Sequence, residues 1–193
     1  STRENFTIQK NILYRMIKFF KNLFWKPRVE PEVLKLDYKA EELKIGFTLD
    51  YGLKNWEVID KTMYVWENGV RDFEFTLEQK NEKKYLNYEP ADQKFSIYWQ
   101  EKLVNVCPDA RKNMDGGNMD FNFSYEGKNY QLSSSAKASV KTSKERFNMV
   151  NWLFASDDEN HFVSFNKYED GSKEAYVGKS IHEHEVGNIF PSA

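Results

Sequence analysis

The sequence predicts a mainly β protein, built from two related antiparallel β units that are barrel-like or sandwich-like and are preceded by one N-terminal amphipathic helix. Two stretches read alike: Y-x-x-K-N-W-x-V begins at Tyr51 and Y-x-x-K-N-Y-x-L begins at Tyr125, an offset of 74 residues. Aromatic residues make up 16% of the chain, and these side chains favour pleated, half-buried surfaces. Similarity at this spacing is typical of two copies of a small β unit.

A second block of similarity extends the first towards the C-terminus. Four apolar residues recur at an offset of 77: Leu77, Tyr85, Leu86 and Tyr88 are matched by Phe154, Phe162, Val163 and Phe165. The stretch from Cys107 to Asn118 contains a proline and two glycines, which mark a boundary. We therefore predict a helix and linker over residues 1–32, a first β unit over 33–107, a linker over 108–118 and a second β unit over 119–193.

Residues 8–25 form the one segment with a clean helical period. At about 100° per residue, the large apolar side chains fall on one half of the helical wheel, and the basic side chains and asparagines fall on the other. Every charge on the polar half is positive. Pro27 ends the segment, because proline lacks the N–H group that a helix interior needs.

Two interpretations of this helix stay open. In the first, its apolar face docks on the β body and its lysines contact solvent. In the second, it lies on an anionic membrane surface or in the groove of a protein partner, which a basic polar face flanked by Phe and Trp favours. The residues for this contact are Lys10, Ile12, Arg15, Met16, Lys18, Phe19, Phe20, Lys21, Leu23 and Phe24.

After a connector with two prolines, short alternating segments predict the strands of the first unit. Asn68-Gly69 favours a type I′ hairpin between Tyr64 and Phe73. In the strand after this turn, apolar residues alternate with Asp72 and Glu74, which puts one face of the strand in the core. The predicted strands are Val33–Tyr38, Ile45–Leu49, Trp56–Ile59, Thr62–Trp66, Arg71–Leu77, Lys84–Tyr88 and Phe95–Trp99.

The second unit repeats this plan. In residues 133–144, Ala136, Ala138 and Val140 alternate as in a strand, whereas alanine and lysine favour helix, so both assignments stay open there. The predicted strands are Met119–Phe123, Asn129–Leu132, Ala136–Lys141, Phe147–Phe154, His161–Asn166 and Ala175–Val177.

Composition excludes several classes of protein. A net charge of −2 gives no attraction to nucleic acid. Cys107 has no second cysteine to pair with, and we expect it to be a small buried hydrophobe. No apolar run is long enough to span a membrane as a helix, and Arg15, Lys18 and Lys21 interrupt the apolar core that a signal peptide needs. We expect a cytoplasmic protein, peripheral at the inner face of the membrane where the helix binds lipid.

No combination of residues predicts catalysis. A strand would put His182 and His184 on one face, but two ligands do not complete a metal site. The chain has no phosphate-binding glycine motif, and the serines at 133–135 lack an associated base. We predict no catalytic residue, no metal site and no cofactor. Trp56, Tyr130 and Trp152 are the aromatic residues that would line a ligand pocket between the strands.

Several patterns of hydrophobic and turn residues carry a resemblance to a known family. They are L-K-I-G-x-x-L-x-Y from Leu43, F-x-L-E from Phe75, Y-L-x-x-E from Tyr85 and Y-E-G-K-N-Y from Tyr125. With these patterns, the chain resembles the bacterial domain-of-unknown-function family 4178 over about residues 41–186. The resemblance implies an uncharacterised β-rich protein without assigned catalytic residues.

We therefore expect a non-enzymatic bacterial binding or scaffold protein. Its β body would recognise a protein partner, and its basic helix would attach it to an anionic membrane surface or to that partner. The alternative is a β-barrel carrier in which aromatic residues surround a small apolar ligand. A buried, connected cavity would favour the carrier, and a filled core would argue against it.

Overall fold

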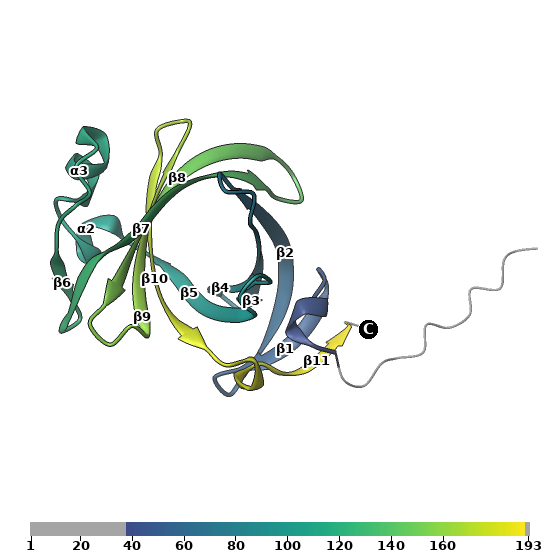
Figure 1. The fold of residues 1–193 in the computed structure, drawn as a ribbon. Helices are drawn as coiled ribbons and strands as arrows, with labels where there is room; N and C mark the ends of the chain where they lie inside the picture. The colour runs from purple at the N-terminus through teal and green to yellow at the C-terminus, as the bar shows by residue number, and fades with distance from the viewer. Residues whose placement is uncertain (1–37, 192–193) are drawn as a thin grey trace, which may run out of the picture. The chain divides into compact units, whose positions relative to one another are not determined.

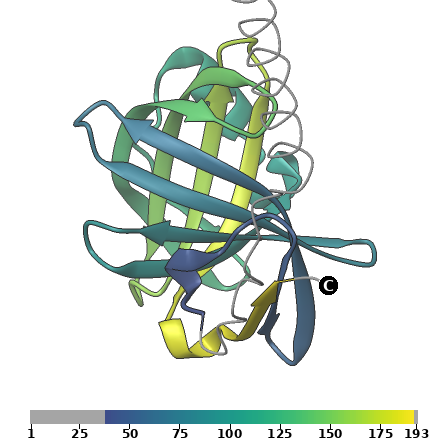
Figure 2. The same cartoon turned by 90° about the vertical axis from the view of Figure 1, so that its right-hand side faces the viewer.

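The strands form one antiparallel sheet that closes on itself. In the computed structural model, which describes residues 38–191, the strand order is β11-β1-β2-β3-β4-β5-β10-β9-β8-β7-β6, and β2 also pairs with β7. This additional pairing closes eight strands, β2 to β5 and β7 to β10, into a barrel (Figure 1). Strands of the near and far walls cross steeply, as the tilted strands of a barrel do (Figure 2). The predicted mainly β class is confirmed.

The elements follow one another with short turns. The strands are β1 (Phe47–Tyr51), β2 (Lys54–Trp66), β3 (Arg71–Gln79), β4 (Glu82–Glu89), β5 (Lys94–Glu101), β6 (Phe123–Tyr125), β7 (Lys128–Lys141), β8 (Arg146–Ser156), β9 (His161–Tyr168), β10 (Lys173–Ile181) and β11 (Gly187–Pro191). The short helices are η1 (Ala40–Glu42), α2 (Leu103–Val106), α3 (Ala110–Gly116) and η2 (Glu183–Glu185). The predicted helix over residues 8–25 lies outside the described residues.

Two long bent strands close the barrel. The predicted strands Trp56–Ile59 and Thr62–Trp66 are one strand, β2, whose register with β3 shifts between Val58 and Asp60. A bulge of this kind bends a strand and sharpens its twist. The first half of β2 therefore pairs with β1, while Met63 to Trp66 pair with β7. These two predicted strands are thus a single strand, with a bulge where the sequence pattern predicts a turn.

The same arrangement recurs in β7. Its register with β8 shifts between Leu132 and Ser134, and its first half pairs with β6. Residues 133–141 are therefore strand and not helix. Trp56 pairs with Leu49 of β1, and Tyr130 pairs with Phe123 of β6, at the offset found in the sequence. The duplication itself stays a prediction.

Two apolar cores lie on the outer side of the barrel wall. In the first, Trp56 and Phe75 pack with Ile189 of β11. In the second, Phe154 and Phe165 pack with residues of α2, α3 and β6, which lie together outside the ring (Figure 1). The segment expected to be a linker, residues 108–118, therefore contains helix α3, and α2 lies at the end of the predicted first β unit. A third, smaller cluster, formed by Ala138, Val140 and Met149, packs with Tyr64 and Trp66. Successive strand residues point to opposite faces, so Glu74 of β3 points inward while Phe75 points outward.

The hairpin at Asn68-Gly69 is confirmed, but its predicted turn type is wrong. The loop between β2 and β3 spans residues 67–70, and only Gly69 has a positive φ, 83°, whereas a type I′ turn needs two such residues. The Asn68 side chain accepts a hydrogen bond from the Val70 amide at 3.0 Å, which fixes a longer turn.

Candidate functional site

The closed barrel encloses a cavity of about 570 Å³, which we call the lumen. On β3, Asp72 and Glu74 line the lumen, while Phe75 and Leu77 belong to the first outer core. Ser164 of β9 likewise lines the lumen, next to residues of the second core. The lumen is therefore lined by buried polar side chains as well as by apolar ones such as Met149 and Leu153.

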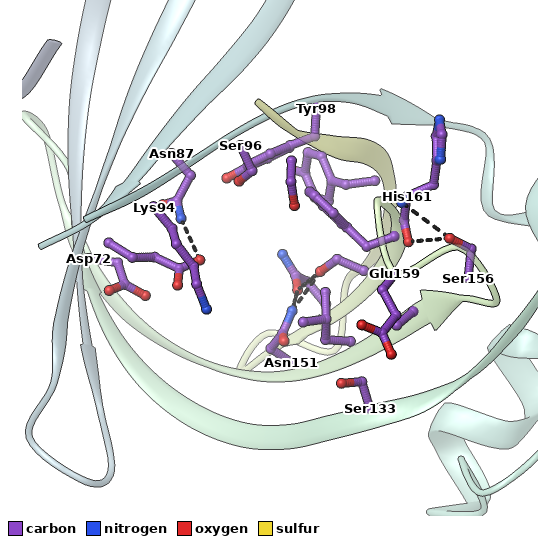
Figure 3. A pocket seen from close by; sticks show the side chains of 18 of the residues that line it. Asp72, Asn87, Lys94, Ser96, Tyr98, Ser133, Asn151, Ser156, Glu159 and His161 are labelled. Carbon is purple, nitrogen blue, oxygen red and sulfur yellow. Dashed lines mark hydrogen bonds between the residues drawn. The ribbon is translucent and has the colours of Figure 1, made fainter. Parts of the chain in front are cut away.

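Exposed residues contribute to one part of the lining of the lumen, which we call its mouth. Lys94 and Glu159, which are exposed lining residues, belong to the mouth. Asp72 and Lys94 lie on one side of the lumen, and His161 and Glu159 lie on the other (Figure 3).

Glu74 is the most deeply placed acid of the lumen. The hydroxyls of Tyr64 and Tyr98 both donate to its Oε2, the former at 2.8 Å. Burial raises the pKa of Glu74 above its usual value, although the hydrogen bonds from Tyr98 and Tyr64 act in the opposite direction. The pKa values of Tyr64 and Tyr98 are raised well above the usual value by burial and by the adjacent Glu74 carboxylate. This group is therefore a buried acid supported by two neutral donors.

Asp72 lies nearer the mouth and is held by a tryptophan. Trp66 Nε1 donates to Asp72 Oδ2 at 2.5 Å. Asp72 Oδ1 is also buried, and no residue between 38 and 191 donates a hydrogen bond to it. Burial raises the pKa of Asp72, whereas the Trp66 hydrogen bond lowers it. Asp72 is thus a carboxylate with one oxygen satisfied and one available.

Further charges surround Asp72 at the mouth. Glu89, the last residue of β4, pairs in register with Lys94, the first residue of β5. Burial and the Asp72 charge raise the pKa of Glu89, and Lys94 lowers it. The Lys94 ammonium contacts Asp92 at 3.4 Å. Carboxylates therefore predominate on this side of the mouth.

A cluster of tyrosines fills the lumen beyond Glu74. Tyr98 stacks on Tyr85 with ring centroids 5.4 Å apart, and Tyr176 meets both rings edge-on. The hydroxyls of Tyr176 and Tyr168 donate to Glu174 Oε2 at 2.5 and 2.6 Å. Burial raises the pKa of Tyr85 to about 12. Of these tyrosines, Tyr98 and Tyr176 line the lumen, and we call the part that they line its floor.

Amide and hydroxyl groups form the wall opposite Asp72. The Asn151 side-chain amide donates to Ser164 Oγ at 2.6 Å and to Asn166 Oδ1 at 2.7 Å (Figure 3). Ser164 also donates to Asn166 at 3.2 Å. These hydrogen bonds satisfy the polar groups of a neutral wall, to which Met149, Leu153 and Ala155 add apolar side chains.

A compact network at the other side of the mouth holds the β8–β9 turn. Asp158 accepts hydrogen bonds from Ser156 Oγ at 2.6 Å and from Lys128 Nζ at 2.8 Å, and it contacts His161 Nδ1 at 3.0 Å. The hydrogen bond from Lys128 is the main cause that holds the pKa of Asp158 well below its usual value. The network fixes His161 at the start of β9.

The aromatic residues predicted to line a pocket lie elsewhere. Trp56 is buried in the first outer core and Tyr130 in the second, and Trp152 packs against the second core. None of the three lines the lumen. The predicted membrane or partner contacts, Lys10 to Phe24, lie outside the described residues.

The other predicted candidates have structural positions. Cys107 is buried beside α2 as expected, and burial raises the pKa of its thiol. His182 and His184 flank the start of η2 with their rings stacked 5.3 Å apart, and so do not share a strand face. Within residues 38–191, no group of three or more metal-binding side chains is arranged to hold a metal ion. Within the same residues, no helix has the length and apolar character needed to cross a membrane.

The sequence analysis allowed for a cavity with an aromatic lining but missed the polar residues of the lumen, because it treated the polar face of each strand as solvated. A signal was present on those faces. Tyr64 and Trp66 alternate with apolar neighbours in β2, and Tyr98 and Tyr176 do so beside Ser96 and Glu174. Large aromatic side chains on a nominally exposed face indicate that the face is buried.

Comparison with known proteins places this architecture among uncharacterised proteins. An uncharacterised protein of Aquifex aeolicus (strain VF5) is 25% identical over 174 residues, which cover 89% of this chain and 96% of that protein. No solved structure matches the chain. The model of the family described as "Domain of unknown function (DUF4178)" matches residues 44–183, more than half of the chain. The chain belongs to the DUF4178 family, as the patterns of its first and second β units predict.

Proposed function

We propose that this protein is a non-enzymatic binding protein whose lumen holds one small polar molecule. The observation that carries the proposal is a cavity of about 570 Å³ inside the closed barrel, whose lining includes the buried carboxyl groups of Asp72 and Glu74 and the buried amide of Asn166. Eight-strand barrels have interiors that side chains fill or that hold one small ligand. Small-molecule sites typically measure about 300–1,000 Å³.

The energetics of the lumen support a binding role. Burial of an ionised carboxylate costs several kcal/mol, and well-packed apolar residues in its place are often neutral or stabilising. Asp72 and Glu74 are 8% and 7% exposed, while the outer cores already supply the apolar burial of the fold. Buried groups with shifted pKa values that line a cavity are typical of functional sites.

The lining favours a polar ligand over the apolar one first considered. Glu74 and Asp72 would each lose solvation to an apolar guest without gaining a donor. We further propose that the basic helix over residues 8–25 attaches the protein to the inner face of the membrane or to a protein partner. The match to the Aquifex aeolicus protein covers 89% of the chain and therefore extends into the segment before residue 38.

A lumen-blocking variant tests the binding role. Ser96 lines the lumen on β5, whereas Ser139 is exposed on the outer face of β7. A thermal-shift screen of small polar molecules and of fractionated cell extract should identify stabilising compounds for the wild type and Ser139→Phe, but not for Ser96→Phe. Stabilisation that persists in Ser96→Phe, or no stabilising compound for the wild type, would contradict the proposal.

A further inference from the structure

Asp72 has an unsatisfied oxygen in the wall of the lumen. The residue is 8% exposed, its Oδ2 accepts from Trp66, and its buried Oδ1 has no donor among residues 38–191. An ionised carboxylate accepts about four hydrogen bonds, so this one is under-satisfied. Asp72 also lines the lumen, so a molecule bound there lies next to this carboxylate. A ligand that donates a hydrogen bond would complete the group.

The charged groups around Asp72 favour a ligand with a positive charge. Glu74 lies two residues along the same face of β3, and Glu89 ends the adjacent strand. Lys94 is the nearby cation, and its ammonium contacts Asp92. An anion would meet like charges in a site of low dielectric, whereas a cation would be attracted. The donor is therefore a positively charged group.

An aromatic wall stands beside the same carboxylate. The Trp66 ring stacks on Tyr64 with centroids 5.9 Å apart and an interplanar angle of 14°. The hydrogen bond to Asp72 fixes the indole, so the aromatic wall and the carboxylate keep a constant relation. Aromatic faces attract cations within about 6 Å and also pack against apolar groups. The site thus suits a molecule with one charged end and an apolar body.

A metal ion fits this site poorly. Metal ions such as Ca²⁺ and Mg²⁺ take six or more oxygen ligands at about 2.0–2.6 Å. Between residues 38 and 191, no three metal-binding side chains come together in this way. The cavity of about 570 Å³ instead has room for a molecule of many atoms.

We propose that the lumen binds a primary or secondary organic ammonium ion, which donates an N–H to Asp72 and lays its apolar part against Trp66 and Tyr64. This inference rests on the proposed binding function of the lumen and names the chemical class of its ligand. An N–H donor is required because Asp72 Oδ1 lacks a hydrogen bond, so a quaternary ammonium ion should bind less well.

Three probes of similar shape test this assignment by isothermal titration calorimetry at pH 7. They are 2-phenylethylamine, its neutral analogue 2-phenylethanol, and the quaternary phenethyltrimethylammonium ion. We expect the amine to bind about tenfold or more tightly than either of the others. Asp72→Asn should weaken amine binding about tenfold or more, while Asp120→Asn at an exposed position should leave it unchanged. Asparagine keeps an oxygen for Trp66, so the fold should be retained.

The outcomes separate this inference from the proposed function. Equal binding of the amine and the alcohol, or amine binding that survives Asp72→Asn, would overturn the ammonium assignment and leave lumen binding intact. If none of the three probes binds, while another compound is excluded from the lumen by Ser96→Phe, the assignment fails and the binding function stands. If no compound depends on an open lumen, both fail.

Discussion

Gly178 of β10 and Tyr98 of β5 face each other in register, and a Cβ atom on Gly178 would lie 2.5 Å from Tyr98 Cβ. The same atom would lie 2.6 Å from the Phe162 ring and 2.7 Å from the Ile97 carbonyl oxygen. The backbone of Gly178 does not require glycine, since its φ is not positive. The close approach of Tyr98 and Phe162 therefore explains why glycine occupies position 178.

Gly178→Ala should destabilise the barrel by about 1–3 kcal/mol, because an added methyl group overpacks this contact. The measurement is the free energy of unfolding from urea denaturation followed by tryptophan fluorescence. Gly116→Ala is the matched control, because nothing lies within 4 Å of the added atom there. Equal unfolding free energies for the two variants would show that the residues around Gly178 move to accommodate a methyl group, and would contradict this prediction.

Glu74→Gln should change how stability depends on pH. Burial raises the pKa of Glu74 from its ordinary value of 4.5, Tyr98 and Tyr64 oppose the rise, and the charges of Asp60 and Glu174 add to it. The folded chain therefore keeps this proton to higher pH than the unfolded chain, so its contribution to the unfolding free energy falls as pH rises above about 4.5. In Glu74→Gln, the part of the fall in unfolding free energy that Glu74 causes should be absent. Denaturation curves between pH 4 and 8 measure the unfolding free energy, and the control Glu57→Gln, at an exposed position, should follow the wild type.

Trp66 and Asp72 should show energetic coupling. Trp66→Phe removes the donor to Asp72 Oδ2 and leaves a buried carboxylate with less support, which costs about 1–3 kcal/mol. In an Asp72→Leu background, the same change should cost less, because no buried charge remains. A double-mutant cycle of unfolding free energies should give a coupling of about 0.5–3 kcal/mol. Simple additivity would show that the short contact adds nothing to stability.

Asp158→Asn should lower the melting temperature at neutral pH. The hydrogen bond from Lys128 and those from Ser156, the Asn160 amide and His161 lower the pKa of Asp158 below its usual value. Its contribution is therefore present above the unfolded value of 3.8 and is lost as pH falls through the lower folded value. The gap between wild-type and variant melting temperatures, measured at pH 7 and pH 3, should narrow in acid. A gap that stays constant would refute an electrostatic origin.

Charge reversal in the predicted helix tests its attachment role. Lys10, Arg15, Lys18 and Lys21 changed together to Glu should abolish co-sedimentation with anionic liposomes, since each basic residue near such a surface adds about 1 kcal/mol. The melting temperature should stay nearly unchanged if the helix serves a surface. A control in which four exposed lysines outside the predicted helix are reversed, Lys112, Lys137, Lys141 and Lys144, should still bind. If the helix variant still binds anionic liposomes, the proposed role of the helix in membrane attachment is wrong.

Alternation along single strands determined much of the fold. The pattern of Phe73, Phe75 and Leu77 placed one face of β3 in a core, and the structure has Phe75 and Leu77 buried there. Cys107 is buried as its type indicates, and the Asn68-Gly69 turn joins two strands. These features depend on neighbours in sequence, so local propensity is enough to predict them.

Only the tertiary structure decided what the polar faces enclose. Pairing of β2 with β7 joins residues far apart in the chain, and it turns a sheet with a solvated side into a closed lumen. Closure buries Glu74 and Asp72 and gathers Tyr64, Trp66 and Tyr98 around them. In strands such as β3, the sequence alone determined which face is apolar. It left open whether the other face meets water or a cavity, because burial of a polar face depends on long-range pairing that alternation does not encode.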